Sequence, residues 1–476
     1  MNALVERLAA IVGPDHVWEH ERVPPDDTHD ESLTGEPVVP LAVVRPRSTE
    51  EVSRVLRLAD EQRVPVVARG SGTGLSGGAR PMTDGIVVAF DRMARVIEVD
   101  EPNQVAVVQP GVTLAQLDDV LRPLHLVYPV HPGEMSGSLG GNVATNAGGM
   151  RAVRYGVTRH NVLGLEVVLA GGDVMRTGGR FVKCSTGYDL TQLVVGSEGT
   201  LALVTEATLK LVPRLRETVT LLAPFSSLQA VTAAVVPLLH SGATPLILEY
   251  IDTLAMSAIA KAAGIDVGVP DHILSSALAY LVVVLESTHV ERLEQDVEAA
   301  AALLGDVGAL DVYVLPSTAG ADLIAARERA FYVSKAAGAH DIVDTVVPRA
   351  SIPAFLTEVT DLASRHGALV SACGHVGDGN VHLSIFLADE QRRARLLHDV
   401  YAAARRLGGA VSGEHGIGTE KLRYFLDLED PVKLALMRRL KAAFDPHGIL
   451  GPGRLLGPER PAEVERTSAP GEAVPS

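Results

Sequence analysis

Three glycine-rich segments constrain most strongly how this chain can fold. They are residues 69–79, reading RGSGTGLSGGA, residues 132–149 and residues 196–200, and all lie within about 130 residues. Glycine costs roughly 0.5–1 kcal/mol of chain entropy wherever its freedom is not needed, so turns alone do not explain so many. The sequence therefore predicts a long ligand that the backbone approaches closely at several points. The expected donors are backbone amides and the hydroxyls of Ser71, Thr73 and Ser76.

The first segment also has the spacing of a dinucleotide-binding loop. Gly72, Gly74 and Gly77 match G-x-G-x-x-G after an apolar run. A Rossmann loop must open a helix whose N-terminus faces the pyrophosphate, whereas here Pro81 and Gly85 interrupt the chain before the next apolar run. The context therefore disfavours a Rossmann site. It favours a turn whose successive amides bind an anion, and a tight loop without a ligand is the alternative.

Length and composition limit the class of protein. A chain of 476 residues with 47% hydrophobic residues is large enough to fill two or more domains. Its two cysteines, Cys184 and Cys373, are far apart, so we expect neither a disulfide framework nor an iron–sulfur cluster held by this chain alone. Any electrons that the protein collects must therefore leave to another molecule.

Charge and hydropathy exclude further classes. The formal net charge of −16 disfavours nucleic acid and anionic lipid as partners. The longest apolar runs, such as residues 277–285, fall well short of the roughly 20 residues that a membrane-spanning helix needs. Residues 1–12 have charged and apolar residues at helical spacing, which predicts a surface helix and not a signal peptide. We therefore expect a cytoplasmic protein without a transmembrane segment.

Two patterns of apolar runs divide the chain. Strand-like and helical runs from about residue 40 predict a compact α+β domain that ends near residue 213. From about residue 217, helical stretches separate four strand-like runs, which predicts an antiparallel sheet with helices on one face; these runs are residues 218–223, 246–251, 280–286 and 309–315. Residues 457–476 are rich in Pro, Glu, Ala and Ser, which is typical of a disordered tail.

Two late motifs carry candidate metal ligands. Residues 374–382 read GHVGDGNVH, and residues 412–418 read SGEHGIG. If the flanking apolar runs pair as a hairpin with His375 opposite His382, both rings lie on one face with Cβ atoms about 5 Å apart. With Glu414 they would form a set of two imidazoles and a carboxylate that suits Zn²⁺ or Mn²⁺ with one open position. For any single histidine the alternative is a turn cap or a buried hydrogen bond.

Together, the glycine-rich segments, residues 46–52 and residues 109–111 resemble the FAD domain of the vanillyl-alcohol oxidase/PCMH flavoprotein superfamily. The late motifs resemble its glycolate oxidase flavin-subunit, D-lactate dehydrogenase and D-2-hydroxyglutarate dehydrogenase branch. The resemblance spans roughly residues 38–455. It implies an α+β fold with a PCMH-type FAD-binding domain of two α+β subdomains, followed by a ferredoxin-like α+β substrate cap with an antiparallel sheet. We expect the FAD domain over residues 1–213, the cap over 214–412, a segment returning to the flavin over 413–456, and the tail over 457–476.

The resemblance also implies roles for particular residues. It assigns His375, His382 and Glu414 to the metal, His415 to general-base catalysis, and Asn380 to the neighbourhood of substrate or flavin. Arg327 would bind the substrate carboxylate, with Arg329 as its rival, because a planar guanidinium pairs both carboxylate oxygens. The implied FAD contacts are Arg69, Gly70, Ser71, Gly72, Thr73, Gly74, Leu75, Ser76, Gly77, Pro110, Gly111, Gly133, Gly137, Ser138, Gly140, Gly141, Asn142, Asn146, Gly148, Gly149, Glu198, Gly199, Val204 and Arg454.

Three details refine this expectation. Covalent members of the superfamily attach FAD through a histidine in the first glycine loop, and no histidine lies between Arg63 and Ala79, so we expect non-covalent FAD. Ile342 stands where the D-2-hydroxyglutarate branch has a lysine, which favours a substrate with one carboxylate. Gly451 precedes Pro452 where the family usually has asparagine, which puts one flavin contact in doubt.

The sequence thus predicts FAD-dependent, metal-assisted oxidation of a D-2-hydroxy acid, preferably glycolate or D-lactate, to the 2-oxo acid. The hydride would go to flavin N5 and the electrons to an external acceptor: a quinone, a cytochrome, an electron-transfer flavoprotein or an iron–sulfur partner subunit. Alternatives are a D-2-hydroxyglutarate dehydrogenase, a non-redox flavoenzyme like alkylglycerone-phosphate synthase, and a non-catalytic FAD-binding subunit. We expect a homodimer or a hetero-oligomer, which a partner could hold at the inner membrane face.

Overall fold

The computed structural model describes residues 3–215 and 217–457. Its first subdomain is a four-stranded sheet in the order β1-β2-β4-β3, in which β2, β4 and β3 run parallel. Helices α1 and α2 pack against it through the core around Leu8 and Leu56. The bounds are α1 Ala3–Val12, β1 Val17–Trp18, β2 Ala42–Val44, α2 Thr49–Gln62, β3 Val66–Arg69 and β4 Ile86–Ala89. The predicted N-terminal helix is confirmed, and β2, β3 and β4 confirm the strand-like runs expected from about residue 40, whereas β1 was not predicted.

The loop from β3 to β4 contains the first glycine segment and no helix, as the sequence predicts. Gly72 and Gly77 have φ angles of 77° and 76°, a region that favours glycine. A Rossmann arrangement is thereby excluded for this loop, because no helix N-terminus follows the glycines.

The second subdomain is a five-stranded antiparallel sheet in the order β5-β6-β10-β8-β9. Its strands are β5 Val96–Asp100, β6 Val105–Val108, β8 Val162–Val168, β9 Val174–Gly178 and β10 Leu203–Lys210. The sequence does not reveal β5 and β9, because these edge strands are largely exposed and lack an apolar run. Around the sheet lie a strand pair and five helices: β7 Leu126–Val127, β11 Val212–Pro213, α3 Leu114–Leu121, α4 Leu139–Thr145, α5 Ala152–Tyr155, α6 Thr158–Asn161 and α7 Leu190–Val194.

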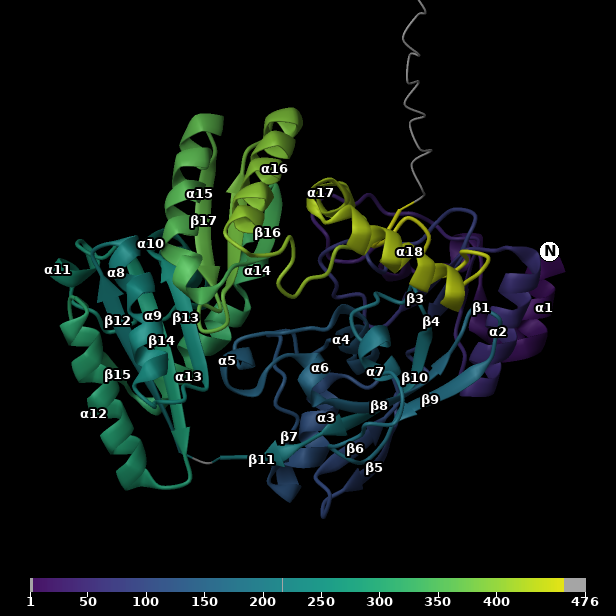
Figure 1. Ribbon diagram of the computed structural model, residues 1–476, viewed down its shortest axis with the longest axis horizontal. Helices are drawn as coiled ribbons and strands as arrows, with labels where there is room; N and C mark the ends of the chain where they lie inside the picture. The colour runs from purple at the N-terminus through teal and green to yellow at the C-terminus, as the bar shows by residue number, and fades with distance from the viewer. Residues whose placement is uncertain (1–2, 216, 458–476) are drawn as a thin grey trace, which may run out of the picture.

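The cap is a seven-stranded antiparallel sheet in the order β15-β12-β14-β13-β17-β18-β16 (Figure 1). The four predicted strands form one part of it, and the late hairpin with β16 forms the rest. The bounds are β12 Glu217–Phe225, β13 Ile247–Asp252, β14 Ala279–Ser287, β15 Tyr313–Leu315, β16 Asp341–Val346, β17 Leu369–Gly374 and β18 Asn380–Phe386.

Helices cover both faces of the cap sheet, so the prediction that they cover one face is wrong. Leu221 faces a core with α8, α9, α12, α15 and α16, whereas its neighbour Leu222 faces a smaller core with α10, α13 and α14. Both faces of the sheet are apolar here, so helices pack against each of them. The helices are α8 Leu228–Ala233, α9 Val235–His240, α10 Thr253–Ala263, α11 Asp271–Leu274, α12 Val290–Asp306, α13 Ser317–Glu328, α14 Ala330–Ala336, α15 Ile352–His366 and α16 Glu390–Arg406.

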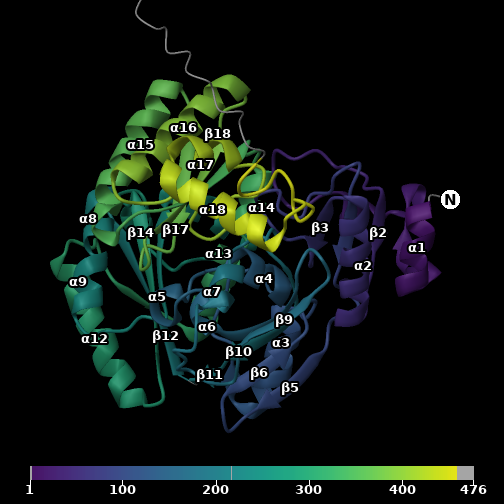
Figure 2. The same ribbon diagram turned by 45° about the vertical axis from the view of Figure 1, so that its right-hand side comes forward.

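After α16 the chain returns to the FAD domain (Figure 2). Helices α17 (Leu422–Leu428) and α18 (Pro431–Phe444) lead to Leu450, which forms a parallel bridge with Val66. The Lys441 ammonium donates to the Thr200 carbonyl at 2.8 Å. Residues 458–476 of the predicted tail lie outside the described residues. Among the described helices none is long and apolar enough to cross a membrane.

Candidate active site

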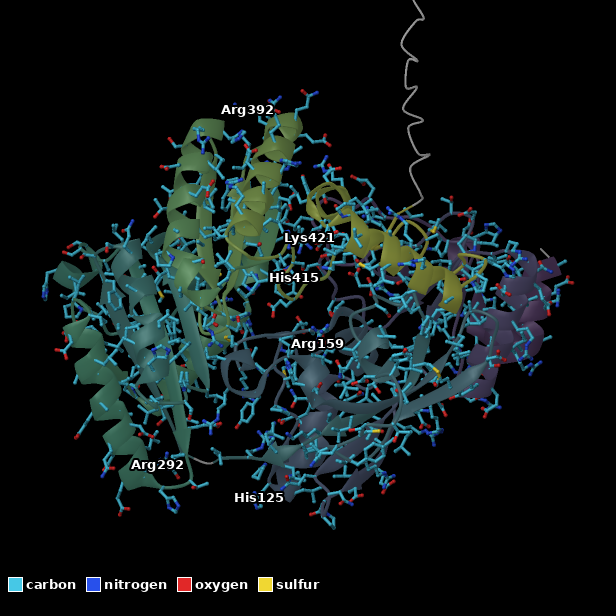
Figure 3. All side chains as sticks on the ribbon, viewed as in Figure 1. His125, Arg159, Arg292, Arg392, His415 and Lys421 are labelled. Atoms are coloured by element: carbon cyan, nitrogen blue, oxygen red, sulfur yellow. The ribbon has the colours of Figure 1, made fainter. Side chains whose placement is uncertain are left out.

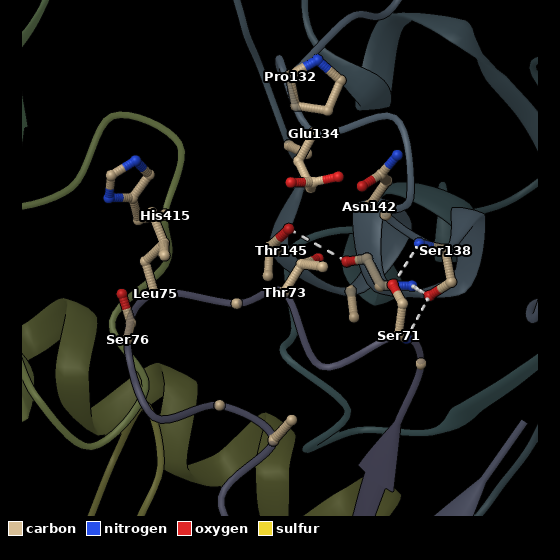
Figure 4. Close-up of a pocket in the computed structure, with 18 of the residues that line it drawn as sticks. Ser71, Thr73, Leu75, Ser76, Pro132, Glu134, Ser138, Asn142, Thr145 and His415 are labelled. Atoms are coloured by element: carbon tan, nitrogen blue, oxygen red, sulfur yellow. Dashed lines mark hydrogen bonds between the residues drawn. The ribbon is translucent and has the colours of Figure 1, made fainter. Parts of the chain in front are cut away.

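The first glycine segment and the N-terminus of α4 line a cavity of about 210 Å³ (Figure 4). Many of the predicted FAD contacts line it: Gly70, Ser71, Gly72, Thr73, Gly74, Leu75, Ser76, Gly137, Ser138, Gly141, Asn142, Gly148, Glu198 and Gly199. An adjoining cavity adds Pro110, Gly140 and Val204. The lining of amides, hydroxyls and small residues fits the diphosphate and the flat rings of FAD.

Hydrogen bonds and close packing join the two main glycine segments. The Ser138 amide donates to Ser71 Oγ at 2.8 Å, and the Ser71 amide donates to Ser138 Oγ at 3.3 Å. A Cβ atom at Gly70 would collide with the Ser138 hydroxyl, and one at Gly140 would come within 2.5 Å of Pro110. These two glycines are therefore required by packing within the protein, independently of any ligand.

The remaining predicted FAD residues support the cavity from outside. Arg69 forms an ion pair with Asp27 at 3.2 Å, and Arg454 donates to the Gly78 carbonyl at 2.9 Å. Side chains at Gly77, Gly111 and Gly149 would collide with Thr419, Phe90 and His131, respectively. Asn146 accepts a hydrogen bond from the Arg159 amide at 2.9 Å, and Gly133 lines the second cavity described next.

A second cavity, of about 120 Å³, lies between the glycine loop and the cap. Thr73, Leu75, Glu414 and His415 line both cavities, so the two are contiguous. The second contains the predicted substrate and metal residues Arg327, His375 and His382 together with Ile342. Figure 3 shows His415 at the junction between the cap and the FAD domain.

Three predicted metal ligands form a compact triangle. His375 Nε2 lies 3.3 Å from His382 Nε2, and Glu414 Oε1 lies 3.2 Å from each of these nitrogens. Ligand atoms 2.0–2.1 Å from a tetrahedral zinc ion lie about 3.3–3.4 Å from one another. The triangle therefore fits three corners of a tetrahedron, with the fourth open to the cavity.

The strand register differs from the one expected. His382 pairs with Cys373, and His375 lies in the turn that follows β17, so the expectation that His375 lies opposite His382 is wrong. The rings still meet edge to face, with centroids 5.0 Å apart, because the turn folds His375 back over the end of the strand. The two histidines thus come together by a different route from the predicted cross-strand pair.

Glu249 was not predicted, and it contacts two of the site residues. Its buried carboxylate contacts His375 Nδ1 at 2.5 Å and the Arg327 guanidinium at 2.9 Å. A carboxylate at Nδ1 fixes the tautomer that leaves Nε2 free for a metal. Burial opposes ionisation of Glu249, but His375 and Arg327 hold its pKa below the ordinary value. A charged residue inside the apolar run 246–251 is the sequence signal that points to it.

The two candidate arginines, Arg327 and Arg329, differ in their solvent exposure. Arg327 is 7% exposed and lines the second cavity, whereas Arg329 is exposed and does not. The Nε atom of Arg327 is buried without a hydrogen-bond partner among the described residues. Arg327 is therefore the arginine placed to receive a carboxylate.

Asp344, also not predicted, holds the loop that carries Glu414 and His415. Its buried carboxylate accepts hydrogen bonds from six donors, at 2.6–3.2 Å: Ser412 Oγ, Lys421 Nζ, Asn380 Nδ2 and the amides of Gly413, Glu414 and His415. Burial raises its pKa, but Lys421 and His415 hold it well below the ordinary value. Because these oxygens are saturated with donors, Asp344 is not free to ligate a metal, although His382 and His415 lie near it.

Asn380 and His415 differ in whether they line a cavity. Asn380 lines neither cavity; its amide donates to Asp344 at 2.7 Å and to the Thr345 carbonyl at 3.0 Å. His415 lines both cavities and stacks on His382 with ring centroids 5.1 Å apart. Burial lowers the pKa of His415 to about 4, so its ring is neutral near pH 7 and can accept a proton.

Glu198 connects this loop to the FAD domain. Its carboxylate accepts from the amides of Ile417 and Gly418, each at 2.7 Å. The loop that carries His415 is therefore fixed from both sides, by Asp344 in the cap and by Glu198 beside the glycine cavity.

Comparison with known proteins agrees with this architecture. Residues 40–178 match the family described as FAD binding domain, and residues 214–455 match FAD linked oxidases, C-terminal domain. The chain belongs to this family of FAD-linked oxidases and is an FAD-dependent oxidoreductase. It has a PCMH-type fold: it superimposes on p-cresol methylhydroxylase with a TM-score of 0.78 at 19% identity, covering 96% of each chain.

Three relatives cover most of the chain. An uncharacterized FAD-linked oxidoreductase of Mycobacterium tuberculosis is 52% identical over 96% of this chain and 100% of its own length. The glycolate oxidase subunit GlcD of Bacillus subtilis is 39% identical, covering 88% and 89% of the two chains. The D-lactate dehydrogenase of Archaeoglobus fulgidus is 38% identical, covering 92% and 97%.

Proposed function

We propose that the protein oxidises a D-2-hydroxy acid, preferably D-lactate or glycolate, to the 2-oxo acid with non-covalently bound FAD. One observation carries the proposal. Two histidines and a glutamate that could hold a metal ion, a further buried histidine and an arginine with an unpaired donor share one cavity, and this cavity opens onto the glycine-rich cavity. The similarity to relatives named D-lactate dehydrogenase and glycolate oxidase subunit supports it.

Each residue has a defined task in this reaction. Arg327 binds the substrate carboxylate, and its ion pair with Glu249 fixes the guanidinium in place. His375, His382 and Glu414 would hold Zn²⁺ or Mn²⁺, which when bound would supply Lewis-acid polarisation of the substrate hydroxyl. His415 accepts the hydroxyl proton. The glycine loop would hold FAD, whose N5 would be the hydride acceptor.

Asn380 and Asp344 act as positioning residues in this proposal. The Asn380 amide helps to orient the Asp344 carboxylate, which in turn fixes the backbone of Glu414 and His415. A displacement of this loop would move a metal ligand and the base together, which makes the reaction sensitive to both residues.

The lining of the second cavity favours a substrate with one carboxylate. Ile342, Met150 and Phe331 surround the space beside Arg327 and offer no cation to a second carboxylate. D-2-hydroxyglutarate is therefore the weaker candidate. The electrons would leave to an external acceptor, and the relative named a glycolate oxidase subunit supports a hetero-oligomer as the working form.

Anaerobic reduction of the bound flavin tests the proposal. D-lactate or glycolate should bleach the flavin absorbance without any further addition, D-2-hydroxyglutarate less efficiently, and L-lactate poorly. If none of these acids bleached an intact flavin, the protein would not be a 2-hydroxy acid dehydrogenase. A non-redox flavoenzyme or a non-catalytic subunit would then be the better account.

A further inference from the structure

A polar cavity of about 80 Å³ lies in the second subdomain and shares no lining residue with the cavities described above. We call it the arginine cavity. Its polar lining comes from Asp118, Tyr128, His131, Arg151 and Arg214, and apolar side chains close the rest. The volume is enough for more than one water molecule or for one small oxyanion.

Arg151 brings an unbalanced positive charge to this cavity. Its Nε atom is buried without a hydrogen-bond partner, and no ion pair to its side chain is found over residues 3–215 and 217–457. Glu286 is nearby but already lies 3.2 Å from Arg154 and accepts a hydrogen bond from Tyr155 at 2.8 Å. Burial lowers the pKa of Arg151, and the carboxylates of Glu286, Glu328 and Asp118 oppose this shift.

The other basic side chains that line the cavity, Arg214 and His131, have few carboxylate partners. Arg214 pairs with Asp118, which also holds Arg122 at 2.7 Å, and the Nε atom of Arg214 is buried without a hydrogen-bond partner. His131 Nε2 contacts Glu328 at 2.6 Å. The two arginines that line the cavity thus each have a buried Nε donor without a hydrogen-bond partner, and the Asp118 carboxylate is shared between Arg214 and Arg122. Tyr128 lines the same space, with its hydroxyl buried.

We propose that the arginine cavity binds a small oxyanion such as inorganic phosphate. Guanidinium groups bind such anions through paired, charge-assisted hydrogen bonds, and a buried charge requires a partner. A volume of about 80 Å³ suits the free anion.

The position of the site connects it to the substrate cavity. Glu328, which holds His131, follows Arg327 in α13 and lines the second cavity. An anion bound between Arg151 and Arg214 therefore shares its cavity with His131, and the contact of His131 with Glu328 joins the FAD domain to the cap. Its binding stabilises the folded protein without touching the reacting groups.

Thermal unfolding of the FAD-loaded protein tests the proposal, with phosphate compared with chloride at equal ionic strength. Phosphate should raise the melting temperature of the wild-type protein in a saturable way. Arg151→Met keeps the apolar stem and removes the donors, and should weaken the apparent phosphate affinity roughly 10- to 100-fold. Arg292→Met, at an exposed arginine of α12, is the matched control and should respond like the wild type.

Crystals grown with selenate provide a second measurement that does not depend on the stability of a variant. An anomalous peak between Arg151 and Arg214 is expected. If Arg151→Met kept the saturable phosphate response, or if the peak lay only in the substrate or flavin cavity, the arginine cavity would not be the site. An equal response to chloride would also overturn the proposal.

Discussion

Replacing Asp344 with asparagine should destabilise the cap and abolish flavin reduction. The buried carboxylate accepts from six donors, including the ammonium of buried Lys421 at 3.1 Å. Asparagine keeps one acceptor oxygen and adds an NH₂ group that faces these donors. Removing one member of a buried ion pair costs about 3–5 kcal/mol, because the remaining charge is left uncompensated.

For a cap of this size, that loss corresponds to a fall in melting temperature of roughly 6–20 °C. Far-UV circular dichroism measures it, and stopped-flow absorbance measures flavin reduction in the same preparation. Asp399→Asn removes an exposed carboxylate that contacts the partly buried His366 and is the control, with an expected change below about 1 kcal/mol. Adding Lys421→Met to the Asp344→Asn variant should recover part of the stability, because it removes the unpaired charge.

Flavin reduction should not recover in this double variant, because the loop of Glu414 and His415 still lacks its anchor. The reasoning would be refuted if Asp344→Asn melted within about 2 °C of the wild type, which corresponds to less than 1 kcal/mol. Normal flavin reduction in that variant would refute the positioning role separately.

Three further predictions concern the cofactor, the metal and the substrate. Acid precipitation should release FAD into the supernatant, and flavin retained in the pellet would contradict non-covalent binding. Dialysis against a strong chelator should abolish turnover and leave the flavin spectrum intact, with recovery on adding Zn²⁺ or Mn²⁺; active enzyme without stoichiometric metal in elemental analysis would contradict the ligand assignment. Ile342→Lys should raise kcat/KM for D-2-hydroxyglutarate relative to D-lactate by roughly 10- to 100-fold, as expected for one new charge-assisted pair, and an unchanged ratio would show that position 342 does not face the substrate.

The sequence predicts the fold well where local patterns are strong. The apolar runs of β2, β3 and β4 and the glycine loop without a following helix are visible in the residues themselves. Edge strands such as β5 are missed, because an exposed strand needs no apolar run. The late hairpin is recognised but its register is not, since His382 pairs with Cys373, two residues before the expected partner His375.

The site residues that belong to local motifs are predictable from the sequence, whereas isolated ones are not. His375, His382 and Glu414 belong to short glycine-flanked motifs, and the structure brings them together. The sequence assigns no role to Glu249 and Asp344, because each is a single carboxylate inside a strand and its partners lie far away in the sequence. The glycine count overstates the contact with a ligand, because Gly70 and Gly140 are required by packing against Ser138 and Pro110.

The separate roles of His415 and His382 test the central claim most directly. His415→Ala should keep its metal and FAD and slow flavin reduction by roughly 10²–10⁴-fold, the usual range for losing a general base. His382→Ala should lose the metal, because two remaining ligands are too few to hold it. His366→Ala, on the outer helix α15, should change neither property. Loss of metal from His415→Ala with retention by His382→Ala would contradict the account.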